Sequence, residues 1–127
     1  MNSDGNMSMD TDIDLFTYLW SGNYDKTLQL LYLTDWKHCL MTGKAVGGIK
    51  WSLPGIGCPF IKAVPPSFPP VYGSIKEAAD HTLTVIKGKS CSYIIRLILS
   101  TYPMLSSNRY IDVDLEEKAL LYKKYFK

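Results

Sequence analysis

Apolar residues recur with the helical period in five segments of the chain. These segments are residues 12–22, 24–41, 74–87, 90–101 and the stretch from 114 onward. The second carries a wide apolar stripe, which indicates contacts on more than one side. The pattern predicts a mainly α fold, a compact bundle of about five helices.

Residues suited to helix ends flank these segments. Possible N-caps are Asp12 or Asp14, Ser74, and Ser90 or Ser92. Glu77 stands three residues after Ser74 and would complete a capping box. Glycine or proline follows the C-terminal ends, at Gly22, Gly43, Gly88 and Pro103. Local chemistry therefore predicts where most of the helices begin and end.

The middle of the chain lacks a helical period. Residues 45–53 predict a short strand, with 58–64 as its antiparallel partner across the turn signal Pro54-Gly55. The segment AVPPSFPPVYG follows, and its prolines exclude a helix or a central strand and favour an extended loop. We therefore expect a small β-hairpin or an extended Pro/Gly-rich insert, and an α+β fold is the alternative.

Burial can also be predicted from the pattern. The run IIRLIL, residues 94–99, is apolar nearly all round except for Arg96, which is typical of a helix in the middle of a bundle. In the last helix Leu115, Ala119, Leu120, Tyr122 and Tyr125 should face inward.

Length and charge narrow the class of protein. The chain has 127 residues, which suits one domain over residues 12–127 after a polar, disordered lead at 1–11. Its net charge is only +2 and it has no basic stripe, so nucleic-acid binding is not expected. It shows neither a signal peptide nor an apolar run long enough for a membrane span, so we expect a cytoplasmic protein.

Candidate chemistry is sparse. Cys39, Cys58 and Cys91 show no metal-ligand spacing and are interpreted as buried thiols. No nucleophile has a histidine and a carboxylate at a suitable spacing, and the glycine-rich stretch GGIKWSLPGIG lacks the end of a phosphate-binding loop. The sequence therefore predicts no catalytic site, no metal and no cofactor, and a binding protein rather than an enzyme.

Two stretches resemble the Panacea domain, the SocA-like antitoxin family. They are LLYLTDWKHCLMTGKAVGGIKW, from Leu30 to Trp51, and IIRLILSTYPMLSSNRYIDVDLEEKALLYKKY, which begins at Ile94. The sequence departs from the family after Trp51, where SLPGIGCPFIKAVPPSFPPVYG replaces a turn that leads into another helix. The middle of the domain is therefore shortened or remodelled relative to the family.

The resemblance implies a helical protein-binding domain, an antitoxin that neutralises a cognate toxin by direct contact and is of a kind often carried by phages and prophages. It also implies an AAA+ protease as a second partner, if the protein is a proteolytic adaptor. The expected partner-binding residues are Asp35, Lys37, Trp51, Tyr102 and Arg109. The alternatives are a phage-encoded enzyme or inhibitor acting on a host defence system, with a ligand pocket in the Gly/Pro-rich middle, and a nucleic-acid-binding repressor.

Overall fold

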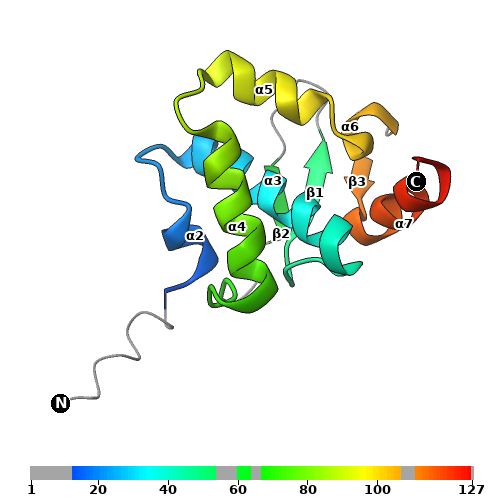
Figure 1. Cartoon of the computed structure of the whole chain (residues 1–127), viewed down its shortest axis with the longest axis horizontal. Coiled ribbons are helices and arrows are strands. Elements are labelled where there is room, and N and C mark those ends of the chain that lie inside the picture. Colours follow the sequence, from blue (N-terminus) through cyan, green and yellow to red (C-terminus); the bar gives the residue numbers. More distant parts are fainter. Residues whose placement is uncertain (1–12, 54–59, 64–66, 107–110, 127) are drawn as a thin grey trace.

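A computed structural model describes residues 13–53, 60–63, 67–106 and 111–126 (Figure 1). Its helices are α2 (Leu15–Tyr18), α3 (Tyr24–Thr42), α4 (Gly73–Ile86), α5 (Cys91–Leu99), α6 (Tyr102–Ser106) and α7 (Leu115–Phe126). Its strands are β1 (Lys50–Leu53), β2 (Phe60–Ala63) and β3 (Ile111–Val113). The predicted mainly α fold with a small β-hairpin is confirmed. The expected lead at 1–11 lies outside the described residues.

Helix α3 is the centre of the fold (Figure 1). It begins at Asn23, whose side chain accepts a hydrogen bond from the Lys26 amide at 2.9 Å, and it ends at Gly43, which has a left-handed φ of 82°. It contacts α2, α4, α5 and α7. Most of its side chains are buried, as the wide apolar stripe predicts. Four of the described helices therefore pack directly on α3.

The prediction that residues 94–99 form the central helix is wrong. Of the two serines predicted as possible N-caps of α5, Ser90 has that role. Its side chain accepts a hydrogen bond from the Tyr93 amide at 3.1 Å. Only Ile94 and Ile98 of α5 are buried, and Leu99 is 42% exposed. In Figure 1 this helix crosses one end of the molecule, so a single face of it meets α3 and α6.

The predicted hairpin is one part of a three-stranded sheet. β1 pairs with β2 in the antiparallel sense, as the sequence predicts, and Trp51 lies opposite Ile61. β3 pairs with the other edge of β1, with Trp51 opposite Val113, so the strand order is β2-β1-β3. β3 was not predicted because three residues are too few to show a period.

Helix α2 is joined to the segment before α4. Asp14 caps it by accepting a hydrogen bond from the Thr17 amide at 2.7 Å. The Leu15 amide donates to Pro69 O at 2.9 Å, and the Val71 amide donates to Ile13 O at 3.1 Å. The described part of the proline-rich segment is therefore extended, and it is paired with the chain in front of α2.

Helix α7 buries less than the sequence predicts. Asp114 accepts a hydrogen bond from the Glu117 amide at 3.1 Å, and Leu115 and Ala119 face the core. Leu120, Tyr122 and Tyr125 were expected inside, but they are 70%, 37% and 64% exposed. The prediction fails for these residues because α7 packs mainly against α3 and α6, so the rest of its surface meets solvent.

The core is one cluster of apolar side chains centred on α3, to which α2, α4, α5, α7, β1 and β3 contribute buried residues. Within the described ranges, no helix is long and apolar enough to cross a bilayer.

Candidate functional site

Asp35 and Trp51, two of the expected partner-binding residues, lie in the interior. Each is 1% exposed. The Trp51 indole N–H donates to Asp35 Oδ2 at 2.8 Å, and the Val46 amide donates to Asp35 Oδ1 at 2.9 Å. The prediction that a partner contacts Asp35 and Trp51 is wrong, because the carboxylate and the indole are directed at each other across the core.

Tyr32 connects the Asp35–Trp51 pair to Thr101, which lies 69 residues further along the chain than Tyr32. Its ring lies edge-on to Trp51, with centroids 5.5 Å apart, and its hydroxyl lies 2.9 Å from Thr101 Oγ1. Burial raises the pKa of Asp35, and the hydrogen bonds from Trp51 and Val46 oppose that rise. We call Tyr32, Asp35, Val46, Trp51 and Thr101 the Asp35 junction.

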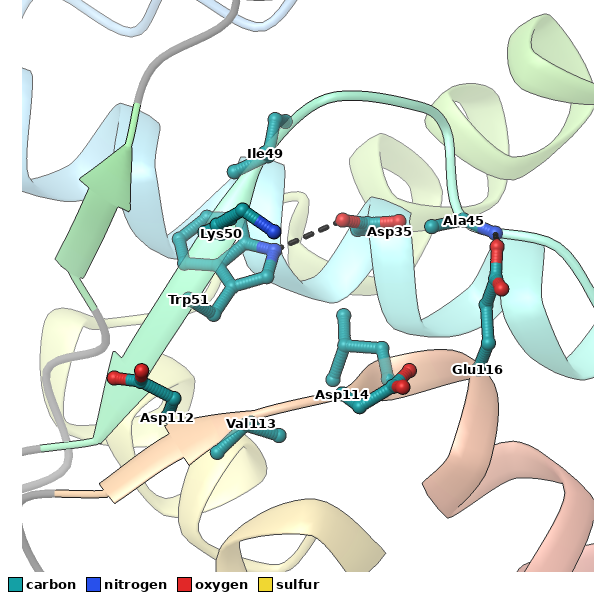
Figure 2. Close-up of a pocket in the computed structure, with 10 residues that line it drawn as sticks. Asp35, Ala45, Ile49, Lys50, Trp51, Asp112, Val113, Asp114 and Glu116 are labelled. Carbon is teal, nitrogen blue, oxygen red and sulfur yellow. Dashed lines mark hydrogen bonds between the residues drawn. The ribbon is translucent and has the colours of Figure 1, made fainter.

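A cavity of about 350 Å³ lies beside the Asp35 junction (Figure 2). The loop after α3, strands β1 and β3, and the first turn of α7 form its walls. Its charged lining residues are Asp35, Lys50, Asp112, Asp114 and Glu116. Four carboxylates in one cavity raise the question of a cation site.

Three of these carboxylates accept hydrogen bonds that hold neighbouring parts of the chain in place. The Glu116 side chain extends from α7 to the loop after α3. There its Oε2 accepts a hydrogen bond from the Ala45 amide at 2.8 Å (Figure 2). Asp114 caps α7, and both oxygens of Asp35 accept hydrogen bonds inside the core. In the part of the chain that the structure describes, no group of three or more potential ligands could hold a metal ion.

The thiols divide between core and surface. Cys39 is buried, as predicted, and burial raises its pKa. Cys91 is exposed, so the expectation that it is buried is wrong. It is the first residue of α5, and the buried residues of that helix are Ile94 and Ile98. Cys58 lies outside the described residues.

His38 joins the end of α3 to the start of α4. Its Nδ1 lies 2.6 Å from Lys44 O and its Nε2 lies 2.8 Å from Ser74 Oγ. Because a carbonyl oxygen only accepts, Nδ1 carries the proton, and in the neutral ring Nε2 accepts from the Ser74 hydroxyl. The predicted capping box at Ser74 is therefore wrong. The helix begins one residue earlier, at Gly73, and the serine hydroxyl is engaged by His38.

A double-mutant cycle tests this role of Ser74. Ser74→Ala should lower the free energy of unfolding by about 1 kcal/mol, and most of that loss should vanish when His38 is already alanine. The control is Ser90→Ala, which removes a cap of α5 and should add independently to His38→Ala. Urea denaturation measures all the variants, and strict additivity of Ser74→Ala with His38→Ala would restore the capping role.

Aromatic side chains gather where α7 crosses the end of α3. The Tyr122 ring lies edge-on to Trp36 with centroids 6.1 Å apart, and it stacks on Phe126 at 5.2 Å. Tyr102 from α6 lies 5.7 Å from Tyr122 and 5.6 Å from Phe126. We call Trp36, Tyr102, Tyr122 and Phe126 the aromatic face. Trp36 forms its buried base, whereas Phe126 is 61% exposed.

A second hollow lies on the other side of Trp36, between α3, α4 and α5. We call this cavity of about 220 Å³ the three-helix groove. Its apolar lining is Leu33, Trp36, Leu40, Val85, Ile86 and Leu97. Lys37 and His81 also line it. Burial lowers the pKa of His81, and the charge of Lys37 adds to this effect.

No protein-family model, curated protein or solved structure matches this chain. The candidate site therefore rests on its own geometry.

The structure separates the expected partner-binding residues into three groups. Asp35 and Trp51 are internal, whereas Lys37 lines the three-helix groove and Tyr102 belongs to the aromatic face. Arg109 lies outside the described residues. Sequence reasoning missed Tyr122 and Phe126 as surface residues. Their signal is an aromatic pair four residues apart, next to Lys123 and Lys124 at an exposed helix end.

Proposed function

We propose that this protein is an antitoxin-like domain that neutralises a toxin by direct contact in the cytoplasm. The aromatic face is the binding surface in this proposal. A folded toxin is the first partner, and an AAA+ protease would be a second partner if the protein also works as a proteolytic adaptor.

The observation that carries the proposal is the exposure of the aromatic face. Phe126 and Tyr122 are 61% and 37% exposed, and they rest on the buried Trp36. Large aromatic side chains that are partly exposed and already held by stacking lose little freedom on binding, and such residues dominate interface hot spots. The surface is therefore suited to a protein partner.

The placement of the residues that resemble the antitoxin family supports the same proposal. The first stretch supplies Tyr32, Asp35 and Trp51, and the second supplies Thr101; all four meet in the Asp35 junction. The residues that carry the resemblance are therefore in contact with one another in one buried cluster. The antitoxin function is proposed from the resemblance, and in this proposal the aromatic face is the surface that contacts the toxin.

Partner capture followed by co-expression tests the proposal. The tagged protein is used to isolate its partner from the native host, the partner is identified by mass spectrometry, and its gene is expressed alone and with this protein. We expect growth inhibition by the partner alone and relief on co-expression. A captured partner that leaves growth unchanged would refute the antitoxin function.

Two substitutions then test the surface. Tyr122→Ala and Phe126→Ala should each weaken binding of the purified partner by about thirtyfold, which corresponds to about 2 kcal/mol at an interface hot spot. Tyr125→Ala is the matched control, because Tyr125 is an exposed aromatic residue of the same helix that lies outside the aromatic face. If all three variants bind like the parent and melt like it, the binding surface is not the aromatic face.

A further inference from the structure

The three-helix groove and the aromatic face are continuous. Leu40 lines the groove, and it also lines a cavity of about 330 Å³ with Tyr122, Lys123 and Phe126. Trp36 lines the groove on one side and contacts Tyr122 on the other. An occupant of the groove would therefore extend onto the surface assigned to the partner.

The length of the groove suits a short helix. Leu33, Trp36 and Leu40 lie in one row along α3, and the row from Leu33 to Leu40 is about 10 Å long at the helical rise per residue. That is about two helical turns, which is the span of three apolar anchors on one face of a docked helix.

The lining favours a helix over an extended strand. The residues of α3, α4 and α5 that form the groove lie within helices, where their backbone amides are already hydrogen-bonded. A strand in the groove would bury its own amide and carbonyl groups without partners, whereas a helix satisfies its backbone internally.

The lining also disfavours a small polar ligand. The hydroxyl groups that line the groove are those of Thr82 and Thr101. Thr82 Oγ1 accepts a hydrogen bond from Thr34 at 3.0 Å, and Thr101 Oγ1 donates to Ile98 O at 2.7 Å. These hydroxyl groups are engaged inside the protein, so apart from Lys37 and His81 the contacts left for an occupant are apolar.

The charges at the rim indicate an acidic occupant. Lys37 is the charged residue of the groove lining and Lys123 is that of the adjoining cavity, and no carboxylate lines either one, although Lys123 also lines a neighbouring hollow with Asp114, Glu116 and Glu117. Neither lysine forms an ion pair with another residue in the part of the chain that the structure describes. An occupant with carboxylates beside its apolar face would meet both ammonium groups.

We infer that the three-helix groove binds one amphipathic helix of the partner protein, with an apolar face seated on Leu33, Trp36 and Leu40 and with acidic residues directed at Lys37 and Lys123. This inference rests on the proposed function, because it assigns a shape and a charge to the partner that the aromatic face would bind.

Designed peptides test the groove without knowledge of the partner. The probe is a helical peptide of fourteen residues with leucine or phenylalanine at positions i, i+4 and i+7 and glutamate on both flanks. One comparison peptide carries lysine on the flanks, and another has the same composition with the apolar residues spread around the helix. Amide and methyl NMR shifts of the ¹⁵N,¹³C-labelled protein locate the bound peptide, and its fluorescence anisotropy gives the affinity.

The glutamate peptide should bind at least about tenfold more tightly than the lysine peptide, with the largest shifts at Val85, Ile86 and Leu97. Lys37→Glu should reverse that preference, and Lys123→Glu should weaken binding of the glutamate peptide. Lys124→Glu is the matched control: it makes the same charge change one residue along α7, where the ammonium lies over the Tyr125 ring, and it should change the affinity by less than about twofold.

The inference is overturned if the glutamate peptide binds no better than the scrambled one, or if its shifts lie away from the groove. It also fails if a toxin captured by this protein binds the Lys37→Glu variant as tightly as the parent while Phe126→Ala abolishes binding. In that case the antitoxin proposal stands and the groove is not used. Failure of the captured partner to inhibit growth refutes the antitoxin function instead, whatever the peptides show.

Discussion

Trp51→Ala should lower the free energy of unfolding by about 3 to 5 kcal/mol, the usual cost of truncating a large buried aromatic residue. Two losses add at this position. The substitution leaves a void against Tyr32 in the core, and it removes the indole N–H that donates to the buried Asp35. A loss of that size is a large share of the stability of a small domain. Thermal and urea denaturation should both show it.

Two other tryptophan variants separate these losses. Trp51→Phe keeps most of the apolar volume but removes the donor, so it should cost about 1 to 3 kcal/mol. Trp20→Ala truncates a tryptophan that is 53% exposed, and it should cost about 1 kcal/mol or less. If Trp51→Ala melts within a degree of the parent, Trp51 is not an interior residue and its predicted role as a partner contact becomes open again.

Ile98→Ala should cost about 2 to 5 kcal/mol, whereas Leu99→Ala should change the stability by less than about 1 kcal/mol. The two residues are neighbours on α5 with similar side chains. Ile98 is fully buried, and Leu99 faces solvent. The difference arises because α5 packs on α3 through one face only.

The comparison of these two variants decides the place of α5 in the fold. Urea denaturation at one protein concentration gives both values. If the two substitutions cost the same, α5 is surrounded on all sides, as its apolar sequence predicts. A difference of several kcal/mol would instead support the peripheral position.

Helix ends were predictable because they depend on neighbouring residues. Asp14, Ser90 and Gly43 have the predicted roles, since a cap or a left-handed residue acts within a few positions along the chain. Gly22 and Ser74 are exceptions: α2 already ends at Tyr18, before Gly22, and the Ser74 hydroxyl is bonded to His38, which lies 36 residues earlier. A local rule cannot anticipate a partner so distant in sequence.

Burial was predicted less well because it depends on which elements become neighbours. The period of an apolar stripe shows which side of a helix can be buried, but it does not show whether another element lies there. Leu99 and Leu120 are apolar and exposed for this reason. The same limit explains the candidate site: Asp35 is a charged residue near the end of a helix, which suggests a surface, and only the strand that brings Trp51 beside it makes it internal.

The Asp35 junction also constrains how the molecule opens. The carboxylate lies on α3, but its two donors come from Val46 and Trp51, which are 11 and 16 residues further along the chain. Neither donor can leave without exposing a buried carboxylate that has lost a partner, so the loop after α3 and strand β1 should separate from α3 as one cooperative unit. The Val46 amide and the Trp51 indole should then exchange their protons with solvent through the same rare opening, even though one lies in a loop and the other in a sheet.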